Sequence, residues 1–142
     1  AWRAMTSPSR PPQRPPRRHT RRPARIGRDT FERWVDETLA ELPAWVVARI
    51  DNLQVIVEDW PTEEDDPEGT GLLGLYTGIS LLERGVDYFG AMPDTITVFM
   101  GPHLAMGLPP EELRLEVRRT VLHELAHHLG IDDARLHELG WD

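Results

Sequence analysis

Residues 111–129 contain neither glycine nor proline, and the Pro109-Pro110-Glu111-Glu112 sequence that leads into them has the composition of a helix start. Prolines suit the entry of a helix and acidic residues suit its first turn, so the segment predicts a helix that runs to Leu129. Its apolar residues form one stripe, made of Val117, Val121, Leu125 and Leu129, with Leu122 and Ala126 beside it. The fold must therefore bury one side of this helix.

The same helix carries the sequence His123-Glu124-Leu125-Ala126-His127. Residues four apart lie about 40° apart around a helix and one turn along it, so His123 and His127 can reach one ion from one face. Both point away from the Leu125 and Leu129 stripe. Glu124 lies beside them, where it can accept a proton from an activated water rather than bind the ion. The pattern predicts a zinc site.

The chain continues with His128-Leu129-Gly130-Ile131-Asp132-Asp133. Gly130 permits the sharp turn that ends a helix, and such a turn can bring Asp133 back toward the ion as a third ligand. Two histidines and one carboxylate, with one open position, make up a catalytic zinc site. Two alternatives stay open for the third ligand. Asp132 is either a ligand or the N-cap of a final helix over 133–139, and His137 lies one turn beyond Asp133.

Three other residues near these positions have competing interpretations. His128 falls beside the apolar stripe, which favours a structural role. His103 follows Gly101-Pro102, in a predicted loop that could reach the site. Tyr76 is interpreted as a packed strand aromatic, although a phenol can also stabilise an oxyanion.

Composition excludes several other chemistries. The chain has no cysteine and no lysine, and its serines are confined to Ser7, Ser9 and Ser80. Thiolate metal sites, Schiff-base lysines and the lysine of a phosphate-binding loop are thereby absent, and a Ser-His-Asp triad has little room. Histidine and carboxylate chemistry remains.

Residues 1–28 hold nine arginines, six of the 13 prolines and no acidic residue, while residues 29–142 hold all 24 acids. This segment has almost nothing to bury, so we expect a disordered tail over 1–28 and one domain over 29–142. The tail could contact an anionic partner, but the acidic body would repel a phosphate backbone, so nucleic acid is not favoured. The chain lacks the apolar segment of a secretory signal and the roughly 18 apolar residues of a membrane span, which predicts a cytoplasmic protein.

Periodicity predicts the remaining elements. Asp29-Thr30-Phe31-Glu32 has the form of a capping box before a helix that ends at Pro43, and a second short helix is expected over 44–50. Strands are expected over 53–58, 72–79 and 95–100. Gly74 and Gly78 lie inside the second of these, where glycine can mark a bulge or a close approach of another backbone.

The core 29–142 resembles the minimal zincin-like metallopeptidases, a family of small bacterial proteins. The resemblance rests on His-Glu-x-x-His-x-x-Gly-x-x-Asp and on three further segments, namely Leu72-Leu73-Gly74-Leu75-Tyr76 with Glu83-Arg84-Gly85, Asp94 to Met100, and Gly130 to Trp141. It implies an α+β fold in which a small three-stranded sheet packs against the metal helix, after two N-terminal helices. It also implies Zn²⁺ held by His123, His127 and Asp133, Glu124 as general base, and a peptide or protein substrate.

The chain departs from the larger metzincin clan in one respect. That clan has a methionine turn after the third ligand, whereas every methionine here precedes the motif and only nine residues follow Asp133. We therefore expect Trp141 or the 95–100 strand to form the floor of the site.

The leading hypothesis is a zinc peptidase of modest activity, since an aspartate ligand makes the ion a weaker Lewis acid. Its substrate would add to a sheet edge, such as the glycine-containing 71–79 strand. The alternatives are a non-catalytic metal-binding or interaction module, whose basic tail recruits an anionic partner, and a zinc hydrolase of non-peptide amides or esters.

Overall fold

The computed structural model describes residues 4–6, 26–85 and 92–141. The elements of this part of the chain are α1 (Arg28–Ala40), α2 (Ala44–Val47), β1 (Leu53–Glu58), β2 (Gly74–Thr77), β3 (Asp94–Phe99), α3 (Met100–Ala105), α4 (Pro110–Leu129) and α5 (Asp133–Leu139). Among these helices, none combines the length and the apolar character that a membrane crossing needs.

The three strands form one mixed sheet with the order β1-β3-β2. β1 runs parallel to β3, whereas β2 runs antiparallel to it and pairs Gly74 with Val98. β3 is thus the central strand and β2 lies at an edge. Along β1, half-buried and exposed residues alternate, as expected for a sheet with one covered face.

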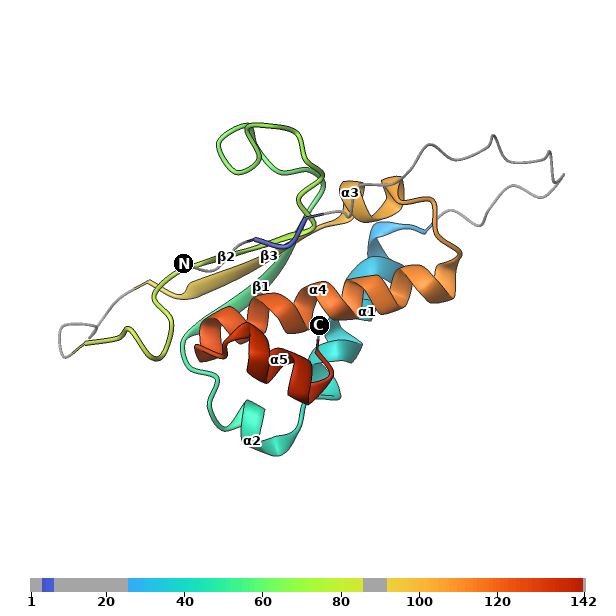
Figure 1. The fold of residues 1–142 in the computed structure, drawn as a ribbon. Coiled ribbons are helices and arrows are strands. Elements are labelled where there is room, and N and C mark those ends of the chain that lie inside the picture. Colours follow the sequence, from blue (N-terminus) through green and yellow to red (C-terminus); the bar gives the residue numbers. More distant parts are fainter. Residues whose placement is uncertain (1–3, 7–25, 86–91, 142) are drawn as a thin grey trace, which may run out of the picture.

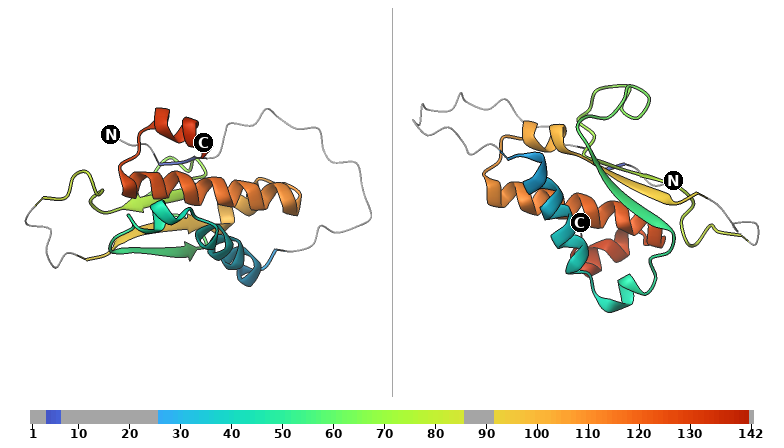
Figure 2. Two further views of the ribbon diagram at one scale, coloured as in Figure 1. Left: turned by 90° about the horizontal axis from the view of Figure 1, so that it is seen from below. Right: turned by 180° about the vertical axis from the view of Figure 1, so that it is seen from behind.

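Helix α4 lies across the covered face of the sheet (Figures 1 and 2). Ile96 and Val98 of β3 are fully buried there, and α1 packs beside α4 and adds Phe31 to the same core. The α4 side of the core consists of the predicted stripe, namely Val117, Val121, Leu122, Leu125, Ala126 and Leu129. The expected α+β fold, with a small sheet against the motif helix, is confirmed.

Most element predictions hold, with four corrections. The strand over 53–58 and the helices over 110–129 and 133–139 have the predicted bounds. The capping box is wrong, because α1 begins at Arg28 after Gly27, and no side chain caps its N-terminus. The second strand is shorter than 72–79, and the helix expected over 44–50 ends at Val47.

The fourth correction concerns His103, which lies in a helix rather than in a loop near the site. It is fully buried in α3, with Nδ1 2.6 Å from the Phe99 carbonyl oxygen and Nε2 2.9 Å from Thr120 Oγ1. Burial lowers the pKa of His103 to about 4, so the ring is neutral near pH 7. His103 therefore links α3 to α4.

Of the predicted tail, residues 1–3 and 7–25 lie outside the described part of the chain. Within the tail, Ala4, Met5 and Thr6 are described, and they lie beside residues 72 and 73 (dark blue in Figure 1). The last tail residue, Arg28, opens α1.

Candidate metal centre

The His-Glu-x-x-His sequence occupies the last two turns of α4. The rings of His123 and His127 lie side by side, with centroids 5.0 Å apart and planes inclined at 65°. His123 is partly exposed, whereas His127 is 4% exposed. The structure thus brings the two imidazoles together on one side of the helix, as is required for both to bind one metal ion.

Glu124 lies between the imidazoles and the sheet. Its side chain is fully buried, with Oε2 3.1 Å from His127 Nδ1, and Oε1 accepts a hydrogen bond from the Met5 N–H at 3.2 Å. Within the described residues, Oε2 accepts no hydrogen bond of good geometry. Burying a carboxylate oxygen that accepts no hydrogen bond is costly for stability, so this position requires an explanation beyond packing.

Gly74 of β2 lets the sheet edge lie directly on the turn that carries Glu124. A Cβ atom at this position would lie 2.6 Å from Thr120 Cγ2 and 3.1 Å from Glu124 Cγ. The sequence predicted a bulge or a close approach of another backbone at this glycine, whereas the atoms that come closest belong to the side chains of Thr120 and Glu124.

Replacing Gly74 with Ala is therefore expected to destabilise the protein by about 1–3 kcal/mol, because the new methyl group overpacks this contact. Thr120→Ser removes the clashing methyl group and keeps the hydroxyl that donates to the Glu116 carbonyl. The double variant should recover part of the loss, which a double-mutant cycle of urea unfolding measures. Gly85→Ala is the matched control, because a Cβ there would meet no atom within 4 Å. Additive effects at Gly74 and Thr120 would contradict the packing argument.

Behind the motif, a buried cluster joins α4 to the sheet and to the loop after β2. We call Asp94, Tyr76, Arg84 and His128 the Asp94 cluster. Tyr76 donates its hydroxyl hydrogen to Asp94, Arg84 donates at 2.9 Å, and His128 Nδ1 lies 2.9 Å from the same carboxylate. His128 Nε2 accepts the Asp51 N–H at 3.2 Å. The structural interpretation of His128 and the packed position of Tyr76 are confirmed.

The protonation states in this cluster follow from its contacts. Burial acts to raise the pKa of Asp94, but the hydrogen bonds from Tyr76, His128 and Arg84 outweigh it and hold the pKa below its usual value. Burial lowers the pKa of His128, although Asp94 opposes the shift. His128 is thus a neutral imidazole whose Nδ1–H donates to Asp94 and whose Nε2 accepts.

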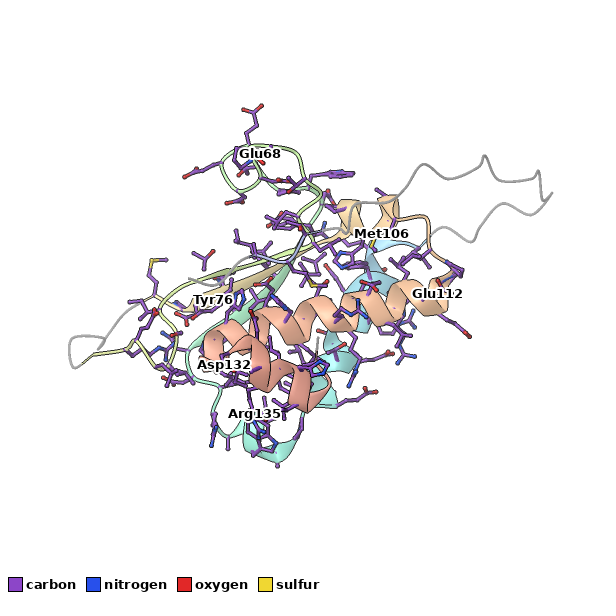
Figure 3. The ribbon with its side chains drawn as sticks, viewed as in Figure 1. Glu68, Tyr76, Met106, Glu112, Asp132 and Arg135 are labelled. Carbon is purple, nitrogen blue, oxygen red and sulfur yellow. The ribbon has the colours of Figure 1, made fainter. Side chains whose placement is uncertain are left out.

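The turn after α4 is built by Gly130, whose φ of 71° is left-handed. Across this turn the Ile131 N–H donates to the Ala126 carbonyl at 2.9 Å, and the Leu81 N–H donates to the His128 carbonyl at 2.9 Å. The predicted helix-ending turn is confirmed. It is followed at once by α5, whose start is marked by Asp132 in Figure 3.

The acidic residues at the start of α5 have separate positions. Asp132 is the N-cap, and its Oδ1 accepts the Arg135 N–H at 2.8 Å. Asp133 is the first residue of α5 and is exposed, as is His137 further along the helix. The described residues contain no group of three or more His, Asp or Glu side chains that could hold a metal. Asp133 therefore does not complete a set of three ligands with His123 and His127 in this arrangement. Of the expected floor residues, Trp141 is buried and stacks on Trp45.

Comparison with known proteins now adds to this geometry. The model of the family described as zincin-like metallopeptidase matches residues 50–141. The chain belongs to the zincin-like metallopeptidase family. The match spans the sheet, the motif helix and α5 of this zincin-like chain, but not α1, α2 or the tail. A search of curated proteins finds no match.

Proposed function

We propose that this zincin-like chain is a zinc-dependent peptidase that uses Glu124 as its general base. The observation that carries the proposal is the Glu124 carboxylate, fully buried beside two imidazoles, with Oε2 accepting no hydrogen bond from the described residues. A zinc ion with a purely structural role needs no such base, and structural sites are usually closed by four ligands rich in cysteine, which the chain lacks.

The residues present fit zinc through the chemistry of their donor atoms. Two neutral imidazoles on one helix face are common zinc ligands, and a carboxylate completes a catalytic set. Although Asp133 does not meet the two imidazoles in this arrangement, we assign the third position to it, because the carboxylate of its neighbour Asp132 is engaged in capping α5. Membership of the zincin-like metallopeptidase family supports zinc as the metal.

When bound, zinc supplies Lewis-acid chemistry: it polarises the scissile carbonyl group and lowers the pKa of water. Glu124 then accepts a proton from the attacking water and donates it to the nitrogen of the leaving amine. The substrate is a peptide in extended conformation, which adds to the edge of the sheet at β2. Main-chain hydrogen bonds at this edge align the peptide beside α4.

We expect the purified protein to contain one zinc ion per chain and to cleave members of a peptide library. A chelator should abolish cleavage and added zinc should restore it, because both steps of the chemistry need the metal. His123→Ala and His127→Ala should lose the zinc. The matched pair at α5 tests the third ligand: Asp133→Ala should weaken zinc binding, whereas Asp132→Ala should keep the zinc and lower stability by about 1 kcal/mol.

Calorimetric zinc titration and metal analysis provide the measurements, and His137→Ala is the control on the same helix. Loss of zinc from His137→Ala rather than from Asp133→Ala would move the third ligand to His137. Chelator-insensitive cleavage, or a zinc-loaded protein that cleaves no peptide in the library, would contradict the proposed function.

A further inference from the structure

Residues Ala4–Thr6 lie beside Leu72 and Leu73, the two residues that lead into β2, and contact Glu124 of the candidate metal centre. The Met5 carbonyl accepts the Leu73 N–H at 3.0 Å, and Thr6 forms an antiparallel bridge with Leu72. The Met5 N–H in turn donates to Glu124 Oε1 at 3.2 Å. A segment from the start of the chain thus joins the edge of the sheet to the buried carboxylate, 119 residues away in sequence.

All of these contacts use the main chain of the segment. An edge strand presents unpaired N–H and C=O groups, and an extended peptide of almost any sequence can pair with them. Ala4–Thr6 makes the same kind of contact, in the antiparallel direction and in an extended form. It also engages the carboxylate that must accept a proton from water during hydrolysis. A second peptide cannot pair with Leu72 and Leu73 while the segment is there.

We propose that Ala4–Thr6 is an intramolecular inhibitor that occupies the peptide-binding edge and must leave before a substrate binds. This inference rests on the proposed function, since it names the regulation of that same site. The segment is a competitor tethered to its own site. The apparent affinity for substrate is therefore the intrinsic affinity multiplied by the fraction of molecules in which the edge is free. The segment raises KM and leaves kcat unchanged.

The full chain with Met5→Pro tests the inference, because proline removes the N–H that donates to Glu124 and keeps the rest of the chain intact. Met5→Leu is the matched control, since it keeps the N–H and a side chain of similar volume. We expect KM for a cleaved library peptide to fall about 5- to 10-fold in Met5→Pro relative to Met5→Leu, at equal kcat.

Two further measurements do not depend on activity. The Leu73 amide should exchange its hydrogen faster in Met5→Pro, because its acceptor is the Met5 carbonyl. A fluorescent synthetic peptide with the sequence of residues 1–10 should also bind Met5→Pro at least 5-fold more tightly than Met5→Leu, measured by anisotropy. The zinc-loaded chain should keep its Ala4–Met5 bond intact in mass spectrometry.

The outcomes separate the inference from the proposed function. If the Leu73 amide hydrogen exchanges at the same rate in Met5→Pro and Met5→Leu, the inference is overturned. It is also overturned if exchange is faster in Met5→Pro but peptide binding and KM are unchanged, because the segment would then have a purely structural role. Cleavage between Ala4 and Met5 would make the segment a substrate and would also overturn it. Tighter binding of the labelled peptide to a zinc-loaded Met5→Pro variant that hydrolyses nothing would uphold the inference and overturn the proposed function.

Discussion

Glu124→Gln is expected to lower kcat/KM for peptide hydrolysis by about 10²- to 10⁴-fold, the range that a positioned general base contributes. The amide has the shape of the carboxylate, so it fits the buried space beside Gly74, but it cannot accept a proton from water. Zinc content should stay at the wild-type level, because His123 and His127 remain. The measurements are steady-state kinetics with a cleaved library peptide and metal analysis of the same preparation.

Glu116→Gln provides the control for this substitution. Glu116 lies on the same helix two turns earlier, where its side chain is partly exposed and pairs with Arg119 at 3.3 Å, so its amide variant should keep full activity. Loss of zinc from Glu124→Gln would make this residue a ligand rather than a base. Full activity in Glu124→Gln would remove the general base from the proposed mechanism.

Asp94→Ala is expected to lower the free energy of unfolding by about 3–5 kcal/mol, the cost of breaking a buried charge pair. The Asp94 side chain is 2% exposed and that of Arg84 is 8% exposed, so the substitution leaves a buried guanidinium without its main counter-charge. Asp51→Ala is the control. Asp51 pairs with the same Arg84 at 2.8 Å, but its side chain is 70% exposed, so the loss should be below about 1 kcal/mol.

The pH dependence gives a second check on Asp94. Its pKa is held below the usual value in the folded protein, so its contribution is complete above the unfolded pKa of about 3.9 and is lost as the pH falls through the folded pKa. In urea unfolding, the difference between wild type and Asp94→Ala should therefore shrink below about pH 4. A difference that stays constant down to pH 3 would show that packing rather than charge causes the destabilisation.

The elements with strong periodicity or clear end signals could be predicted from sequence. The stripe from Val117 to Leu129 and the left-handed Gly130 define α4 and its end, and β1 alternates along a β-branched segment. Helix α3 was missed because Gly101-Pro102 resembles the end of a strand rather than the first turn of a helix. The capping box at Asp29 failed because the N-cap is Gly27, two residues before Asp29, which places Asp29 inside the first turn of the helix.

The pairing of His123 with His127 is local, so helical geometry alone could predict it. The contacts that surround the pair are not local. Asp94 contacts His128 across 34 residues of sequence, and Met5 contacts Glu124 across 119 residues. No repeat or motif in the sequence indicates either contact. The contact made by Met5 could not be predicted either, because the arginine- and proline-rich composition of residues 1–28 predicts disorder. The third ligand stays a prediction, because Asp133 lies in a new helix whose orientation α4 does not determine.

The hydrogen bond from the Leu81 N–H to the His128 carbonyl joins the end of the motif helix to the loop after β2 without using a side chain. Apart from Arg84, which pairs with Asp94, side chains in this loop can therefore diversify during evolution without breaking this link to α4. Proline at position 81 is the exception, because it has no hydrogen to donate. Under the proposed function, selection for a new cleavage preference can thus act on this loop, provided that it spares Arg84 and the main-chain hydrogen bond of Leu81.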